Sequence, residues 1–337
     1  MPILVTGGAG YIGSHTVIEL IQSGEEVVIV DNLSNASRES LDRIREITGV
    51  EPKFYEGDIR NQSYLEFIFF AHNIESVIHF AGLKAVGESV KEPLKYYENN
   101  VAGTISLCNA MANAKVNRLI FSSSATVYGD SDIMPLHEGL PTGIPSNPYG
   151  QTKLMVETVL NDLAMANPDL SLGLLRYFNP IGAHPSGLIG EDPLGIPNNL
   201  VPFVVRVATG VYPQVMVFGS DYPTKDGTGI RDYIHVMDLA KGHVKCLKYL
   251  KSRTGVHTFN LGTGQGYSVL DVIETFREVS GKSIPIQMTD RREGDVAECW
   301  AETQKAKRVL GWEAELGIQE MIEDTWRWQR NCGCNSG

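Results

Sequence analysis

The residues best suited to chemistry are a serine, a tyrosine and a lysine in the first half of the chain. Tyr149 and Lys153 lie four positions apart, just after the capping sequence Ser146-Asn147-Pro148. They would share one face of a helix near its N-terminus. Ser124 ends the run Phe121-Ser122-Ser123-Ser124, which follows a predicted strand. A phenol and a hydroxyl placed together could move the proton of a substrate alcohol.

Such a base needs a large change in acidity. A free tyrosine titrates near pH 10, so its pKa must fall by about three units, roughly 4 kcal/mol, for it to act near neutrality. Lys153 would supply a positive charge, and the helix N-terminus adds a partial one. We therefore predict Tyr149 as the base, Lys153 as its electrostatic partner, and Ser124 as the group that orients the alcohol and relays the proton. Tyr-x-x-x-Lys alone is common by chance, so the surrounding elements decide its meaning.

A glycine-rich turn near the N-terminus indicates a nucleotide site. The apolar run 3–5 leads into Gly7-Gly8-Ala9-Gly10-Tyr11-Ile12-Gly13 and a helix, and a second apolar run ends at Asp31. Strand, glycine turn, helix, strand and acid in this order form the dinucleotide-binding pattern, although an ordinary flexible turn could also contain such glycines. Gly7 and Gly10 would let the backbone approach a pyrophosphate, and Gly13 would let the helix pack against the strand. Asp31 would bind ribose hydroxyls and repel a 2′-phosphate, which favours NAD over NADP.

Strand and helix patterns alternate through the rest of the first half, which predicts an α/β fold with a doubly wound parallel (Rossmann) sheet. The predicted strands and helices of this half are strands 53–55, 76–80, 118–122 and 172–176 and helices 37–48, 61–72, 93–114 and 148–166. Residues 180–232 are rich in proline and glycine. Beyond residue 180 we predict helices at 197–210, 236–251, 268–280 and 317–329 and strands at 215–218, 256–260 and 285–288.

This pattern divides the chain into an NAD-binding domain over residues 1–178, a smaller mixed α/β substrate lobe over 179–330, and a tail over 331–337. The chain would cross between the lobes more than once, so some later segments would return to the first domain. Cys332 and Cys334 lie in the tail, which we expect to be a frayed end without a metal role.

Composition excludes several classes of function. The 337 residues carry a net charge of −11, which argues against non-specific binding to nucleic acid or to anionic membranes. No apolar run approaches the roughly 20 residues of a membrane span, and no secretory signal pattern precedes the first strand, so we expect a cytoplasmic protein. The five cysteines are scattered and odd in number, without zinc-binding spacing, and we expect no metal.

Further motifs carry a resemblance to a known family. They are His79–Ser89, Leu175–Pro180, Gly190–Pro193, Asp226–Gly229, Arg231–Val236 and Arg291–Asp295, together with the glycine turn, Asp31-Asn32, Asp58-Ile59, Asn99 and the Ser124/Tyr149/Lys153 set. Together they span about residues 3–330. On these motifs the chain resembles the extended short-chain dehydrogenase/reductase family, and within it the UDP-glucose 4-epimerases.

The resemblance implies roles for individual residues. The residues implied to contact NAD, besides the three glycines, are Tyr11, Ile12, Asp31, Asn32, Asn35, Asp58, Ile59, Phe80, Ala81, Gly82, Lys84, Asn99, Tyr149, Lys153 and Phe178. The residues implied to contact a UDP-sugar are Lys84, Ser124, Tyr149, Asn179, Asn199, Leu200, Met216, Val217, Phe218, Arg231, Tyr233, Arg292, Asp295 and Cys299. Two arginines in this acidic chain, Arg231 and Arg292, suit a diphosphate clamp.

The resemblance also implies a redox-neutral reaction and a homodimer. The C4 carbon of the sugar would be oxidised and then reduced on its other face through a transient 4-keto sugar, with NAD regenerated in each cycle. The subunits would pair through the helical segments 93–114 and 148–166.

Cys299 is a departure, because family members restricted to UDP-glucose and UDP-galactose usually carry tyrosine there. A small side chain would leave room for an N-acetyl group, so we expect UDP-GlcNAc and UDP-GalNAc as further substrates, or UDP-GlcNAc epimerisation as the main activity. A tolerated small core residue is the alternative.

Two other functions share this fold. A sugar-nucleotide 4,6-dehydratase needs an acid pair beside the serine, where this chain has Ala125 and Thr126. A non-catalytic NAD-binding protein often lacks the Tyr/Lys pair, which this chain keeps.

Overall fold

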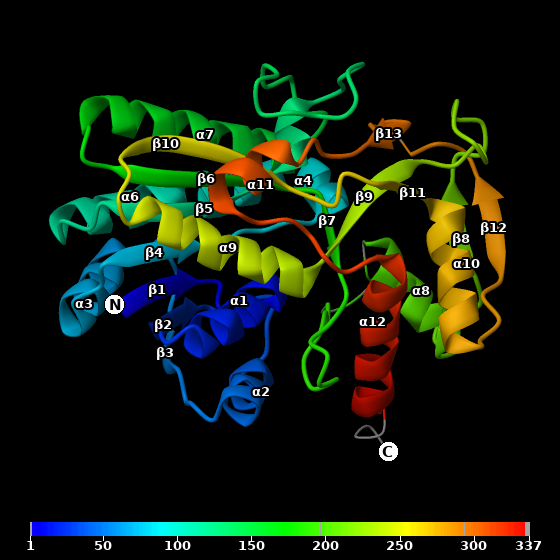
Figure 1. The fold of residues 1–337 in the computed structure, drawn as a ribbon, viewed down its shortest axis with the longest axis horizontal. Helices are drawn as coiled ribbons and strands as arrows, with labels where there is room; N and C mark the ends of the chain where they lie inside the picture. Colours follow the sequence, from blue (N-terminus) through cyan, green and yellow to red (C-terminus); the bar gives the residue numbers. More distant parts are fainter. Residues whose placement is uncertain (1, 194, 196, 198, 293, 334–337) are drawn as a thin grey trace.

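The structure, a computed structural model, describes residues 2–193, 195, 197, 199–292 and 294–333 (Figure 1). Its centre is a parallel seven-stranded sheet. The strand order is β10 (Gly255–Leu261), β6 (Ser171–Tyr177), β5 (Arg118–Ser124), β4 (Ser76–His79), β1 (Pro2–Thr6), β2 (Glu26–Asp31) and β3 (Lys53–Glu56). The predicted doubly wound α/β fold is confirmed.

The strand order reverses between β1 and β4, where a crevice forms at the carboxyl edge of such sheets. Thr6 pairs with Val30 of β2 on one side and with His79 of β4 on the other. The register of β5 and β6 sets Ser124 beside Tyr177. The polar residues that follow these strands are therefore brought to one edge.

Helices cover both faces of the sheet (Figure 1). One face packs against α1 (Tyr11–Gln22), α2 (Glu39–Thr48) and α9 (Val236–Leu250), and the other against α3 (Gln62–His72), α6 (Gly103–Asn113) and α7 (Pro148–Ala166). The predicted helix 93–114 is one continuous rod made of α5 (Pro93–Tyr96), a π-helical segment over Tyr97–Ala102, and α6. A short helix, α4 (Val86–Lys91), precedes it.

The second part of the chain is built around β9 (Ile230–His235). This strand pairs with β7 (Asn179–Ile181), β11 (Gly266–Ser268) and β13 (Glu298–Cys299), while β8 (Val215–Phe218) pairs with β12 (Ile286–Thr289). The helices of this part are α8 (Leu200–Ala208), α10 (Val269–Ser280), α11 (Gln304–Leu310) and α12 (Ile318–Gly333). The apolar core of the lobe joins α8, α10 and α12 to β8 and β9.

Several elements differ from the sequence predictions. The prediction missed β9 because Arg231 and Asp232 interrupt its apolar pattern. Asp232 is nevertheless fully buried. Its carboxylate accepts hydrogen bonds from the N–H groups of Thr263, Gly264 and Ala301, which replace those lost to water. Both α9 and β10 return to the main sheet from the second half of the chain.

The chain end also differs in part from the prediction of a frayed tail. Helix α12 runs to Gly333, so Cys332 is helical, whereas Cys334 and the rest of residues 334–337 lie outside the described residues.

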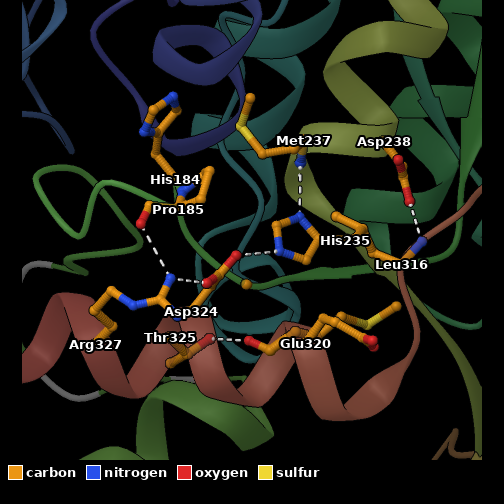
Figure 2. A network of polar contacts seen from close by, with 12 residues as sticks. His184, Pro185, His235, Met237, Asp238, Leu316, Glu320, Asp324, Thr325 and Arg327 are labelled. Carbon is orange, nitrogen blue, oxygen red and sulfur yellow. Dashed lines mark hydrogen bonds and ion pairs between the residues drawn. The ribbon is translucent and has the colours of Figure 1, made fainter. Parts of the chain in front are cut away.

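Polar contacts join α12 to His235 at the end of β9 and to the loop that contains Pro185 (Figure 2). His235 Nε2 lies 3.2 Å from Asp324 Oδ2, and the same carboxyl group pairs with Arg327, which also donates to the Pro185 carbonyl. His235 Nδ1 accepts the Met237 N–H and so caps α9. Among the described residues, no helix has the length and apolar character to cross a bilayer.

Candidate active site

The glycine turn after β1 is enforced by close backbone contacts. A Cβ on Gly13 would lie 2.2 Å from the Gly7 carbonyl oxygen, and one on Gly7, whose φ is +71°, would lie 2.6 Å from the Ala81 nitrogen. A Cβ on Gly10 would meet only the Gly7 oxygen, at 3.4 Å. Gly10 caps α1 without a side-chain hydrogen bond, so no capping side chain competes with a phosphate for the first N–H groups of the helix. The turn therefore fits a dinucleotide.

Asp31 holds this turn in place. Its buried carboxylate accepts the Ala9 N–H at 3.1 Å and the Leu33 N–H at 2.9 Å. Burial raises the pKa of Asp31, while these N–H groups act to lower it. Asp31, which is predicted to contact ribose, therefore also stabilises the glycine turn.

The other residues predicted to contact the adenosine half of NAD lie in different environments. Asn32 donates to Asp58 at 3.2 Å, and hydrogen bonds from Arg60 lower the pKa of Asp58 to about 2. Ile59 is buried and Asn35 is exposed.

The residues after β4 are tied down by an asparagine that sequence reasoning missed. Phe80 and Ala81 donate their N–H groups to the Thr6 carbonyl. Buried Asn100 exchanges two hydrogen bonds with the Leu83 backbone, at 2.8 and 3.0 Å, and donates to Thr152 of α7 at 3.0 Å. Asn99, the predicted NAD contact, donates to Asn100 Oδ1.

The three predicted catalytic residues lie at the carboxyl end of β5 and in the first turns of α7. Asn147 caps α7 by accepting the Gly150 N–H, and Pro148 is its first residue, as predicted. Lys153 is buried, and its ammonium donates to the Ser122 carbonyl at 2.6 Å and lies 5.9 Å from the centre of the Tyr149 ring. Ser124 hydrogen-bonds with Tyr149 and accepts the Thr126 N–H at 3.2 Å.

The electrostatics differ from the sequence expectation. Burial raises the pKa of Tyr149, while the Ser124 hydrogen bond and the charge of Lys84, rather than of Lys153, oppose this rise. Burial also lowers the pKa of Lys153 to about 8, against the attraction of Glu157. The sequence shows that Tyr149 and Lys153 share a face, but the desolvation that controls both pKa values is a property of the packed fold.

Lys84 contacts a residue from the second half of the chain. Its ammonium lies 2.9 Å from Glu191 Oε1, which also accepts from Asn199 at 3.2 Å. It lies 5.8 Å from the centre of the Tyr11 ring, and the Tyr11 hydroxyl donates to the Gly182 carbonyl. The structure thus groups Tyr11, Lys84 and Asn199 around a glutamate that the sequence analysis did not select.

Predicted UDP-sugar residues cluster on β9 and its neighbours. Arg231 pairs in register with Cys299, and its guanidinium lies 3.8 Å from the Asp295 carboxylate. Asn179 of β7 is exposed and pairs with buried Tyr233. Glu293, within the Arg291–Asp295 motif, lies outside the described residues.

The residues of β8 divide between two environments. Arg292 lies 4.2 Å above the Phe218 ring, and Met216 is half-buried like Phe218. Val217, between them, is fully buried in the core of the lobe, so only its backbone could reach a ligand. Leu200, at the start of α8, packs against the same core.

Cys299 belongs to an apolar cluster that also contains Phe178 and Ala125, the residue after Ser124. Burial raises the pKa of the Cys299 thiol to about 11, so it is an uncharged small group rather than a nucleophile. The sequence-distant Cys299 therefore lies in the same cluster as the segment that carries Ser124.

Comparisons with known proteins identify the family of this chain. The model of the GDP-mannose 4,6 dehydratase family matches residues 4–325. The UDP-glucose 4-epimerase of Bacillus subtilis is 60% identical over 98% of this chain and 97% of its own.

Two solved structures are also similar. The UDP-glucose 4-epimerase of Stenotrophomonas maltophila, with bound NAD and formylated UDP-arabinopyranose, superposes with a TM-score of 0.97 at 50% identity, covering 99% of both chains. That of Bifidobacterium longum, in complex with NAD⁺ and UDP, gives 0.96 at 51% identity and 98% of both chains. The chain therefore belongs to the family of the matched model and, within it, to the UDP-glucose 4-epimerases, isomerases that use NAD.

Proposed function

We propose that Tyr149, Ser124 and Lys153 carry out the proton transfers of UDP-glucose/UDP-galactose 4-epimerisation in this chain. Tyr149 removes the proton of the C4 hydroxyl as the C4 hydrogen leaves as hydride, and it returns a proton when the hydride comes back to the other face. Ser124 orients the hydroxyl and relays the proton. The observation that carries this proposal is the hydrogen-bonded Ser124–Tyr149 pair beside the buried Lys153 ammonium.

Bound NAD would supply a reversible hydride acceptor, and its positive charge would oppose the burial that disfavours the phenolate. We assign the glycine turn and the N-terminus of α1 to the pyrophosphate, Asp31, Asn32 and Asp58 to the adenosine side, and the segment 80–84 with Asn99 and Phe178 to the nicotinamide side. Residues 1–178, with α9 and β10, form the NAD domain, and the remainder to residue 330 forms the substrate lobe.

The UDP group stays anchored while the 4-keto sugar turns over. We assign the diphosphate to Arg231, which lies on β9, and to Arg292, whose guanidinium lies 4.2 Å over the Phe218 ring of β8. Guanidinium groups suit this task because each presents several fixed donors to phosphate oxygens. A fixed diphosphate leaves the sugar free to present either face to the hydride.

Cys299 makes N-acetyl sugars acceptable. Its side chain is small, uncharged and clustered with Phe178, so it leaves volume where a tyrosine ring would stand. UDP-GlcNAc and UDP-GalNAc are then additional substrates.

The protein works as a homodimer through the helical segment 93–114 and α7. These helices pack together and expose Leu94, Ile105 and Met155, with Leu94 81% exposed. Apolar side chains grouped on neighbouring helices are typical of a subunit interface. Sedimentation equilibrium should give a dimer, and Ile105→Glu should shift the mass toward a monomer.

We propose a cytoplasmic location. Cys108, Cys246 and Cys299 are free thiols, as is usual in reducing compartments.

The activity is tested by incubating the purified protein with each of the four UDP-sugars, with and without added NAD, and following the products by NMR. We expect interconversion within both pairs and no change in mass. A 4-keto-6-deoxy product would instead support the dehydratase activity after which the matched family model is named.

A further inference from the structure

A buried ion pair lies one helical turn beyond Lys153. Arg176 on β6 donates from Nε to Glu157 Oε1 at 3.0 Å and from Nη2 to Oε2 at 2.6 Å. The Arg176 and Glu157 side chains are only 7% and 4% exposed. Glu157 follows Lys153 by four residues on α7, so both side chains lie on the face that packs against the sheet.

The same carboxylate is joined to the strand that carries the candidate serine. Ser123 Oγ donates to Glu157 Oε1 at 2.5 Å. Ser123 lies between Ser122, whose carbonyl accepts from Lys153, and Ser124. One carboxylate therefore ties β5, β6 and α7 together at the point where Ser124 and Lys153 are presented.

We infer that Glu157 is a positioning residue for the epimerisation, which keeps the Lys153 amine charged and holds it in place beside Ser124. The inference rests on the proposed roles of Tyr149 and Lys153. Arg176 serves it indirectly, because its two hydrogen bonds fix both carboxylate oxygens.

The other groups around Lys153 cannot supply this charge. From β5 it meets the Ser122 carbonyl and the Phe121 ring, at 4.9 Å from its centre. From β4 it faces His79, which stays neutral because burial and Lys153 lower the histidine pKa to about 3. Tyr149 on its own helix is uncharged, since burial raises its pKa. Among the described residues, the charge that acts to keep Lys153 protonated against its burial is that of Glu157.

The decisive variant is the double substitution Glu157→Gln with Arg176→Met. It removes both charges and so avoids leaving a buried guanidinium without its partner. Lysine labelled with ¹³C at Cε allows the Lys153 amine to be titrated by NMR, with its signal assigned by its loss in Lys153→Met. We expect Lys153 to titrate about one pH unit lower than in the parent chain. The alkaline limb of kcat for UDP-galactose should move in the same direction, with KM unchanged.

An unchanged Lys153 titration in the double variant would overturn the inference, and so would a shifted titration with an unmoved kcat limb. Glu157→Asp, which keeps the charge, should retain most of the parent titration. Asp324→Asn, which removes a buried carboxylate paired with His235, is the control for destabilisation and should leave the Lys153 titration in place. Full turnover by Tyr149→Phe would contradict the proposed function rather than the role of Glu157. The titration of Lys153 tests the role of Glu157 whatever the outcome for Tyr149→Phe.

Discussion

The two halves of the candidate site are fixed in different ways. On the NAD side, backbone segments pack directly against each other. A Cβ added at Gly13 would lie only 2.2 Å from the Gly7 oxygen, and Asp31 is buried against the same turn. On the substrate side, half-exposed side chains meet each other, as in the 3.8 Å pair of Arg231 with Asp295. Changes on the first side should therefore break the fold, whereas changes on the second should alter binding.

Gly13→Ala should give the largest effect and tests the first half of this contrast. The new methyl group would meet backbone atoms that cannot move aside, so we expect a loss of about 3 kcal/mol or more in the free energy of unfolding and loss of NAD binding. Chemical denaturation measures the loss of stability, and isothermal titration calorimetry with NAD measures the loss of binding. Gly10→Ala is the matched control, because its Cβ would lie 3.4 Å from the nearest atom and should cost far less stability.

Arg292→Leu tests the second half of the contrast. Loss of a charged donor to the diphosphate should raise KM for UDP-galactose about tenfold to a hundredfold, with the unfolding midpoint unchanged. Arg291→Leu is the matched control, because Arg291 pairs with Asp221 and lies over Tyr222. Equal effects of the two substitutions on KM would contradict the assignment of Arg292 to the diphosphate.

Buried histidines make the NAD side sensitive to acid. Burial lowers the pKa of His79 to about 3, while its two ring nitrogens hydrogen-bond with Thr6 and Thr104. An unfolded histidine titrates near 6.5, so the unfolded chain binds the extra proton between about pH 6.5 and 3, and stability is lost as the pH falls through this range. At pH 5 this one group should cost about 2 kcal/mol relative to pH 7. Urea denaturation at both pH values should show a smaller loss for His79→Gln, and an equal loss would refute the assignment.

Cys299→Tyr should have the smallest effect on the common hexoses and sharpens the contrast among the predicted substrate residues. A ring at this position should remove turnover of UDP-GlcNAc and UDP-GalNAc while turnover of UDP-glucose and UDP-galactose continues. Assays of both pairs on one preparation provide the measurement. Loss of both activities together would refute a gate at this position.

The sequence predicted what depends on local pattern. The glycine turn, the buried strands of the first half and the cap of α7 at Asn147 follow from spacing and residue type, and the structure confirms them. It did not predict β9, where buried Asp232 is satisfied by backbone N–H groups far along the chain. Nor could it assign a role to Asn100, Glu157 or Glu191, because their importance lies in partners from other elements. The sequence analysis expected the pKa of Tyr149 to fall, but burial raises it. Burial depends on contacts between distant elements, so this rise could not be predicted either.

Turnover by Tyr149→Phe tests the central claim most directly. The variant keeps the ring and removes only the hydroxyl, so the fold and NAD binding should persist. We predict that interconversion of UDP-galactose and UDP-glucose, followed by NMR at matched NAD occupancy, falls by at least about a thousandfold, as for loss of a general acid–base group. Interconversion at a rate close to that of the parent chain would contradict the account.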